Sequence, residues 1–327
     1  MKRMHKPENY QITEADINTE NFGDLLNDLT EVVNSEPLYN ISLTRIGIGN
    51  QKSMVNIASM EDPNTYVPVL CEINTGVDLK DNRGIHMSRC IQSIFNLAQK
   101  KYPTLDDFTY ELAKAVKEIQ ETETGFADVS GTYIHKRYTR KTQLESYDSV
   151  HILSKAMYSN NKSRVQTGMK VYNTTACPCT KAFTKYSVVP ELKKAGLSVE
   201  HIQHVLETVT SGTHMQLGTT VLMVDKENSN ISHKDIYNVL DKSLHLVFEL
   251  LKRQDEHDFV RTTIRRPQFT EDAGREVAFN AYEAFKDTLS PNAEMLVESI
   301  LQDSIHIHDV RTLINKTFGD LKNEIEQ

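Results

Sequence analysis

Segments with the signature of β-strands are grouped along this chain, and segments with helical periodicity are grouped between them. Residues 41–48 alternate apolar and polar side chains, as a half-buried strand does, and residues 66–77 are rich in strand-forming residues. Residues 132–139, 150–158 and 165–175 also read as strands, the first two with dense alternation. Grouped strands with grouped helices favour an α+β fold built on an antiparallel sheet.

The order of strands, helices and strands occurs twice. We therefore expect a polar leader at 1–40, a first unit at 41–172 and a second unit at 173–327, although no strong repeat of residues is visible. In the first unit, Ser88 is a plausible N-cap of a first helix, and a second helix is expected over 105–121. A turn is expected at 125–131, before the next strand. In the second unit, long helices are expected after Ser232 and Thr270, and a last strand at 293–301 leads into a C-terminal helix.

Composition limits the class of protein. The 327 residues carry a net charge of −8, which argues against general nucleic-acid binding but not against an anionic substrate held by a local basic cluster. No stretch approaches the ~20 apolar residues of a membrane span, and no apolar segment follows the basic N-terminus as in a signal peptide. The four cysteines do not form a disulfide framework, so we expect a reduced, cytoplasmic protein.

Two of the four cysteines, Cys177 and Cys179, flank a proline. Pro178 fixes its own φ and biases Cys177 toward an extended conformation, which suits a strand end that leads into a helix. A thiolate is a nucleophile or a soft metal ligand. The alternative is two small buried residues at a strand end, since free cysteine is among the most buried residue types.

Familiar catalytic motifs are missing from the sequence. It has no complete glycine-rich nucleotide loop, no His-Glu-x-x-His and no base-deaminase zinc motif. Thiolate, imidazole and carboxylate groups that together suit Zn²⁺ or Fe²⁺ are scattered along the chain. Each also has an ordinary structural explanation, as a turn cap, a solvated helix end, a helix-dipole partner or an exposed strand edge. The set comprises Cys177, Cys179, His214, Glu256, Glu271, His306 and His308.

Six short motifs, taken together and in order, resemble those of the type IB GTP cyclohydrolases, and the resemblance covers about residues 41 to 315. The motifs are RGIHMSR at 83–89, TACPC at 175–179, THMQ at 213–216, RQDE at 253–256, PQFTED at 267–272 and SIHIHD at 304–309. The resemblance implies a tunnelling fold (T-fold) with two tandem units, each an antiparallel sheet with a helix pair. It also implies a homotetramer with active sites at subunit interfaces.

The resemblance implies roles for individual residues. Cys177, His214 and Glu256 match the positions of ligands for one divalent metal ion, which can be Fe²⁺, Mn²⁺ or Zn²⁺. Glu271 matches the carboxylate that anchors the guanine edge, and His306 matches the histidine placed for proton transfer. His86, Ser88 and Arg89 match a segment near the substrate.

The implied activity is a hydrolase reaction on a cyclic amidine. Water attacks C8 of the guanine ring of GTP, formate leaves, and the product enters pterin biosynthesis. In the bacterial branch this product is 7,8-dihydroneopterin triphosphate for folate, and in the archaeal branch it is the 2′,3′-cyclic phosphate for methanopterin-type cofactors. The sequence does not distinguish between these two products. The long stretch between Cys179 and His214, with an insert at 190–211, resembles the archaeal branch.

Two features of the sequence concern the binding of the triphosphate: a cluster of arginines, and two positions that differ from the family's pattern. Arg261, Arg265 and Arg266 form a basic cluster in an acidic chain and are candidates on the basis of their charge. Met215 and Leu217 stand where the family usually has Asn and Arg. The missing Arg is a residue that would otherwise be expected to help bind the triphosphate.

Two alternatives remain open. A nitrile-reducing relative on the same fold would use Cys177 as a covalent nucleophile without metal, but its Glu-Ser-Lys-Ser stretch is not found here. A non-enzymatic protein with a structural metal site would want four protein ligands, commonly two cysteine pairs, whereas Cys71 and Cys90 are isolated.

Overall fold

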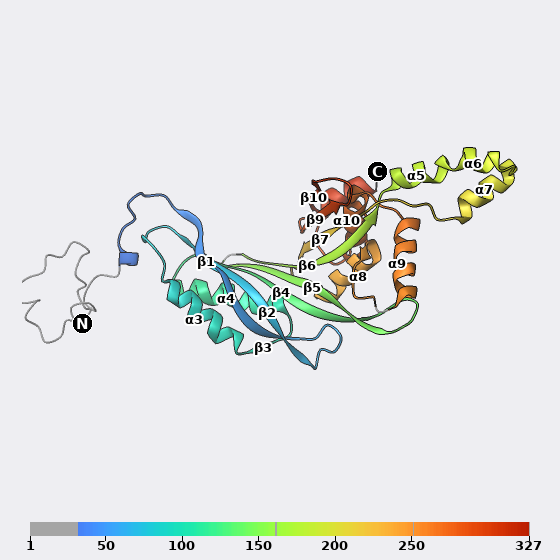
Figure 1. Cartoon of the computed structure of the whole chain (residues 1–327). Coiled ribbons are helices and arrows are strands. Elements are labelled where there is room, and N and C mark those ends of the chain that lie inside the picture. Colours follow the sequence, from blue (N-terminus) through green and yellow to red (C-terminus); the bar gives the residue numbers. More distant parts are fainter. Residues whose placement is uncertain (1–31, 161, 251, 327) are drawn as a thin grey trace, which may run out of the picture.

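A computed structural model describes residues 32–160, 162–250 and 252–326. The ten strands of this part form a single sheet, along which the order is β10-β9-β7-β6-β5-β4-β2-β1-β3, with β8 paired to β6. Figure 1 shows the sheet running through the molecule, with α3 and α4 near one end and α8 to α10 near the other.

The element bounds are as follows. The first half contains η1 Val32–Asn34, β1 Leu43–Ala58, β2 Tyr66–Leu79, α3 Met87–Ala98, β3 Lys101–Tyr102, α4 Leu105–Gln120, β4 Thr124–Tyr138, β5 Glu145–Ser159 and β6 Ser163–Ala176. The second contains α5 Pro178–Ser187, α6 Val189–Lys194, α7 Val199–Thr208, β7 Met215–Asp225, α8 His233–Ser243, β8 His245–Leu246, α9 Arg253–Arg265, α10 Thr270–Phe285, β9 Glu294–Asp303, β10 Asp309–Thr317 and α11 Phe318–Ile325.

The predicted fold of two tandem units, each with its own antiparallel sheet, is wrong. β6 pairs with β5 from Lys170 to Ser163 and with β7 from Gln166 to Ala176, so the two halves share one continuous ladder. The sheet is also mixed, because β3 runs parallel to β1. Alternation within a strand predicts that the strand has a buried face, but it carries no information about which neighbour the strand pairs with.

The division at 172/173 falls inside β6, and it stays a prediction about domain organisation. The leader predicted at 1–40 lies outside the described residues up to residue 31. Residues 32–40 contain only a short 3-10 helix, Val32–Asn34.

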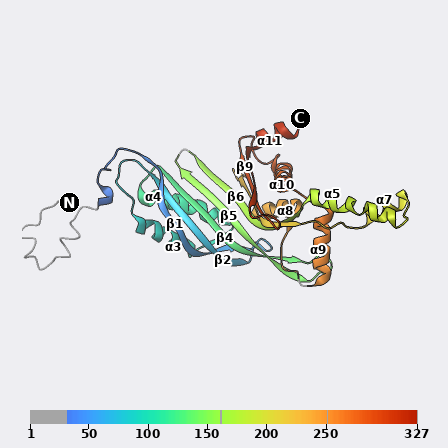
Figure 2. The same cartoon turned by 45° about the horizontal axis from the view of Figure 1, so that its top comes forward.

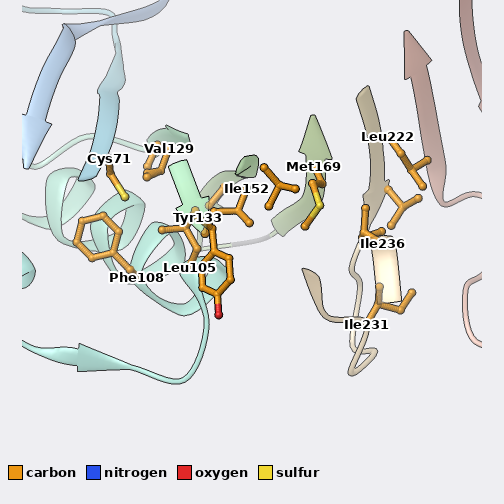
Figure 3. Packing of buried hydrophobic residues seen from close by; sticks show 14 of the residues in the cluster. Cys71, Leu105, Phe108, Val129, Tyr133, Ile152, Met169, Leu222, Ile231 and Ile236 are labelled. Carbon is orange, nitrogen blue, oxygen red and sulfur yellow. The ribbon is translucent and has the colours of Figure 1, made fainter. Parts of the chain in front are cut away.

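Helices cover one face of the sheet. Burial alternates along β4 and β5, so every second side chain lies in the core and its neighbours face outward. α4 packs on β4 and β5, and α10 packs on β9 and β10. Figure 3 shows the core extending from Phe108 of α4 through Ile152 and Met169 to Leu222 and Ile236.

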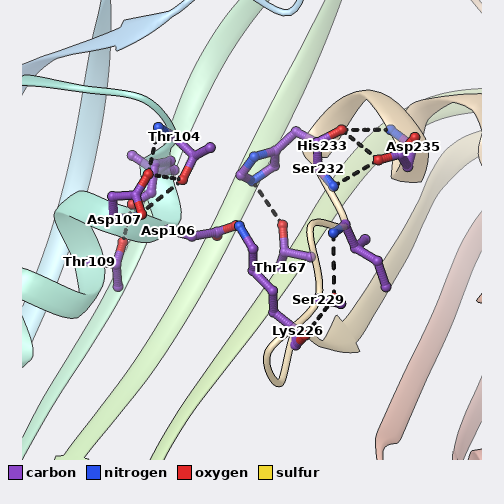
Figure 4. Close-up of polar contacts among 12 residues, drawn as sticks. Thr104, Asp106, Asp107, Thr109, Thr167, Lys226, Ser229, Ser232, His233 and Asp235 are labelled. Atoms are coloured by element: carbon purple, nitrogen blue, oxygen red, sulfur yellow. Dashed lines mark hydrogen bonds and ion pairs between the residues drawn. The ribbon is translucent and has the colours of Figure 1, made fainter. Parts of the chain in front are cut away.

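Polar contacts also join the two halves (Figure 4). Lys226, which follows β7, donates to the buried carboxylate of Asp106 in α4 at 2.9 Å. His233 at the start of α8 lies 3.1 Å from the carbonyl oxygen of Leu153 in β5. These contacts fix α4 and α8 to the same sheet.

Several local expectations differ from the structure. The strand expected at 41–48 is longer than predicted, because β1 continues past Asn50 (φ 57°) through a register shift to Ala58. Residues 125–131 lie inside β4, where Gly125 packs against the backbone of Ala113 in α4 too closely for a side chain. The chain after residue 308 forms β10 before its last helix.

The helix expected after Ser232 stops at Ser243, where His245–Leu246 pairs with β6 instead. In this region the pairing with β6 overrides the apolar periodicity that continues to residue 251.

Helices α5, α6 and α7 form an arm that extends away from the sheet in two views (Figures 1 and 2). The arm spans Pro178–Thr208 and overlaps the insert that the sequence predicts at 190–211, within which α7 lies and at whose start α6 lies. The arm begins immediately after Cys177, so the base of the arm is also part of the candidate site.

Candidate active site

Strands β6 and β7 bring Cys177 and His214 together. Their antiparallel ladder ends at the pair Ala176 and Met215, so the next residue on each strand is one of the two. The backbone N–H of Cys177 donates to the carbonyl oxygen of His214 at 3.1 Å. Two residues that are 37 positions apart in the sequence therefore meet because of strand register, and not because of local motif structure.

Cys177 is also the N-cap of α5. Its Sγ accepts a hydrogen bond from the backbone N–H of Thr180 at 3.5 Å, and Pro178 occupies the first helical turn as expected. Burial acts to raise the pKa of the Cys177 thiol, but hydrogen bonds from Thr180 and from the His214 side chain outweigh it and lower that pKa. This environment therefore favours the thiolate, the form that binds metals, more than the environment of an ordinary cysteine does.

Asp303 completes this cluster from β9. It faces Gln216 across the β7–β9 ladder, and its Oδ1 lies 2.8 Å from Nδ1 of His214. Burial acts to lower the pKa of His214, but the hydrogen bonds to Asp303 and Cys177 raise it. Gln216 donates to Asp303 at 3.3 Å and accepts from Thr175 at 2.6 Å.

The sequence analysis did not single out Asp303. The available signal was its position directly before the SIHIHD motif. Its partner, His214, lies 89 residues away, so spacing could not pair the two.

His306 and His308 lie in the turn between β9 and β10. Both side chains are exposed, and their rings stack with centroids 5.0 Å apart. Asp303 Oδ1 accepts from the backbone N–H of Ile305 at 3.2 Å, which connects this turn to the Cys177–His214 cluster. The structure thus places His306 three residues beyond a carboxylate of that cluster.

Glu271 lies exposed in the first turn of α10. The N-cap of this helix is Phe269 and not Thr270, and the carboxylate of Asp272 accepts from the Phe269 N–H at 3.1 Å. Glu271 lines a cavity of about 490 Å³ between α10, β10 and α11, together with Arg275, Phe279 and Lys316.

Glu256 lies apart from Cys177 and His214. It is exposed in the first turn of α9, where its neighbour Asp255 binds Thr142 in the β4–β5 hairpin. A hydrogen bond connects α5 to the C-terminal end of α9, where the Lys181 side chain donates to the carbonyl oxygen of Arg265 at 3.3 Å. Within the described ranges, no three His, Cys, Asp or Glu side chains are placed together to hold a metal ion.

The predicted segment His86, Ser88 and Arg89 is far from Cys177 in one chain. α3 begins at Met87 with His86 as its N-cap, so the helix starts earlier than Ser88. Gln120 at the end of α4 holds the backbone of His86 on both sides, and Arg89 donates to the carbonyl oxygen of Ile119. Figure 1 shows α3 and α5 at opposite ends of the molecule.

The three candidate arginines differ in their contacts. All three are exposed, but Arg266 also donates to the carbonyl oxygen of Ser243 and pairs with Glu276 at 2.7 Å. Arg266 therefore has a structural role at the end of α9.

Comparison with known proteins identifies the class. Residues 29–312 match the family described as type I GTP cyclohydrolase folE2. A GTP cyclohydrolase MptA of Methanococcus aeolicus is 30% identical over 310 residues, covering 90% of this chain and 99% of that protein. GTP cyclohydrolase MptA 2 of Methanocella arvoryzae is 29% identical over 298 residues, covering 88% and 96%.

Among solved structures, the uricase of Arthrobacter globiformis matches with a TM-score of 0.44 and 9% identity, covering 84% of this chain and 93% of the uricase. That likeness says nothing about the activity of this chain.

The match over most of its length makes this chain an enzyme of the GTP cyclohydrolase type. It belongs to the type I GTP cyclohydrolase folE2 family, whose reaction belongs to pterin biosynthesis. The protein family and the enzyme class therefore agree with the resemblance found in the sequence. The non-enzymatic alternative is set aside. No helix of residues 32–160, 162–250 or 252–326 has the length and apolar character needed to cross a bilayer.

Proposed function

We propose that this protein hydrolyses the guanine imidazole ring of GTP with release of formate, using one divalent metal ion per active site. The product is 7,8-dihydroneopterin triphosphate or its 2′,3′-cyclic phosphate, and the reaction takes place in the cytoplasm. The observation that carries the proposal is the Cys177–His214 pair, with Asp303 bound to the far side of the imidazole.

The donor chemistry of this pair fits a metal site. A cysteine with a lowered pKa and an imidazole with a carboxylate on its other nitrogen are a recurring ligand arrangement. Fe²⁺, Mn²⁺ and Zn²⁺ all suit such donors. Glu256 lies apart from the pair within one chain, and we propose that it supplies the third ligand in the assembled oligomer. When bound, such an ion lowers the pKa of water and so makes hydroxide available near neutral pH.

Other side chains would bind the base and move the proton. We propose that Glu271 accepts two N–H bonds from the guanine edge, which rejects adenine because adenine leaves that acceptor unpaired. The cavity beside Glu271 contains Arg275 and Lys316, which suit an anionic ligand. His306, exposed in its turn, would protonate the ring nitrogen as the C8–N bond breaks.

We further propose that the protein forms a homotetramer and that the active site is completed between its subunits. Among the described residues both edges of the sheet are open, because β10 has one neighbour and β3 covers only Asn56 and Ile57 of β1. α3 packs on β1, and α10 packs on β10. Joining these two edges head to tail would bring Ser88 and Arg89 of one subunit near Glu271 of the next.

The face of the sheet that the helices leave uncovered supports this assembly. Large apolar side chains are exposed along it, which is unusual for a monomer and common at interfaces. They include Met54, Leu70, Ile134, Tyr147 and Leu313.

The test is to incubate the protein with GTP after reconstitution with Fe²⁺, Mn²⁺ or Zn²⁺, with and without chelator, and to measure formate and the product mass. We expect metal-dependent formate, and the mass distinguishes triphosphate from cyclic phosphate. Cys177→Ala should abolish formate release while the protein stays folded. Cys179→Ala is the matched control, because that cysteine is exposed while Cys177 is buried.

Formate release that is unaffected by chelator, or retained in Cys177→Ala, would contradict the proposal. Cys177→Ser separates the two roles of the cysteine, since a hydroxyl still caps α5 but is a poor replacement for a soft thiolate ligand. We expect it to remain folded and inactive.

A further inference from the structure

The arm formed by α5, α6 and α7 has little packing of its own. Neither α5 nor α6 contains a buried residue, and α7 buries only Ile202 and Leu206. Large apolar side chains on the arm face outward instead: Phe183 is 82% exposed, Tyr186 60% and Val199 85%. Figures 1 and 2 both show the arm extending away from the sheet.

Such an arm needs a partner to be stable. Helices shorter than about 12 residues are marginal in water, and most helix stability in proteins comes from packing an apolar face. α5 has ten residues. Apart from the contacts with its cap, Cys177, the hydrogen bond that connects α5 to the rest of the described chain runs from the Lys181 side chain to the carbonyl oxygen of Arg265. The exposed rings of Phe183 and Tyr186 are the apolar side chains available to such a partner.

Charge indicates what the partner is. Residues 178–195 contain four lysines and one glutamate, whereas the whole chain carries a net charge of −8. The α5–α6 part of the arm is therefore basic, although Glu200 and Glu207 of α7 leave the whole of Pro178–Thr208 with four lysines and three glutamates, and the body of the same protein is acidic. A second copy of this chain offers both the opposite charge and exposed apolar side chains, of which Leu70 and Ile134 are each more than half exposed.

We infer that the α5–α7 arm docks on a second copy of this chain, with Phe183 and Tyr186 as its apolar anchors and its lysines facing acidic side chains. The inference rests on the proposed oligomer and names the element that holds it together. Because Cys177 is the N-cap of α5, docking of the arm would also fix the thiol in place. The arm thus links assembly to the geometry of the site.

The experiment compares the wild-type enzyme with the double variant Phe183→Ser/Tyr186→Ser by sedimentation velocity over a range of protein concentrations. The matched control is Tyr39→Ser, which removes a 78%-exposed tyrosine from the segment before β1, outside α3 and α10, the helices at the edges of the proposed interface. Loss of two aromatic anchors should weaken association by roughly 30-fold or more, since aromatic side chains dominate interface energetics. The control should sediment like the wild type.

Amide hydrogen exchange of the wild-type protein gives a second readout that needs no variant. Amides of residues 181–187 should exchange slowly in the oligomer and fast after dilution into monomers. An oligomeric wild type whose mass and α5 protection are both unchanged in the double variant would overturn the inference and leave the proposed oligomer intact. A monomeric wild type would overturn the inference and the proposed oligomer together, while formate release would still test the activity separately.

Discussion

The imidazole of His214 and the carboxylate of Asp303 lie 2.8 Å apart, between the start of β7 and the end of β9. The contact is between Nδ1 and Oδ1, so Nε2 is the ring nitrogen left for a ligand. The same carboxylate accepts from Ile305, which begins the turn that carries His306. One aspartate thus orients the proposed metal-ligating histidine and the segment of the proposed proton donor.

Replacing Asp303 by Asn should weaken metal binding without unfolding the protein. Outer partners of metal-ligating histidines typically contribute 10- to 100-fold to affinity or activity, so we expect a loss of roughly that size in Zn²⁺ affinity and in formate release. Competition with a chromophoric chelator measures the affinity. Asp287→Asn, at an exposed position in the segment between α10 and β9, is the control. Equal Zn²⁺ affinity in the wild type and Asp303→Asn would show that the carboxylate does not support the site.

Glu271→Gln and Glu256→Gln should have different effects. Glu271 lines the cavity beside α10, so its variant should raise the KM for GTP and keep its metal content. Glu256→Gln should lower the metal content of the oligomer, because we propose that it supplies the third ligand. Metal analysis of both variants next to their KM values makes the comparison. If Glu271→Gln lost the metal and Glu256→Gln kept it, the two assigned roles would be exchanged.

Acid should destabilise the protein partly through Glu61. Burial acts to raise the pKa of Glu61, but hydrogen bonds from Ser59, Tyr133 and His135 lower it from 4.5 to about 2. Because the pKa is depressed in the folded state, the stabilisation is present above about pH 4.5 and is lost as the pH falls toward about 2.

The difference in unfolding free energy between wild type and Glu61→Gln should therefore shrink over that pH range. Urea unfolding at a series of pH values measures it. Glu123→Gln is the comparison, since the ion pair of Glu123 with Lys80 lies at the surface and should contribute little at any pH. A difference for Glu61→Gln that stays constant from pH 6 to pH 2.5 would refute this account.

Lys226→Met should destabilise the fold strongly, because it leaves the carboxylate of Asp106 without its ion pair. Asp106 is 3% exposed and Lys226 17%, and removing one member of a buried pair costs about 3–5 kcal/mol. The double variant Asp106→Asn/Lys226→Met should recover part of that loss, since no charge then remains buried. Denaturant unfolding of the two single variants and the double variant measures the interaction between Asp106 and Lys226. If the double variant lost as much unfolding free energy as the two single variants together, the two residues would not interact as described.

Local features of the sequence were sufficient for several elements. The helix expected at 105–121 is α4, Leu105–Gln120, because Thr104 and Asp107 form a capping box and the apolar spacing is helical. The start of α5 after Cys177 also follows from local chemistry, with a proline in the first turn. The six motifs in order predicted the enzyme class that the family match confirms.

The tertiary structure decided what depends on pairing between distant segments. The β6–β7 ladder joins the two predicted units into one sheet, and alternation within a strand cannot specify its neighbour. The β7–β9 register brings Asp303 to His214, whereas Glu256 stays at the far end of α9 from the arm. Short-range propensities and caps act over a few residues and are readable in the sequence, but strand order and register depend on the free energy of the whole sheet.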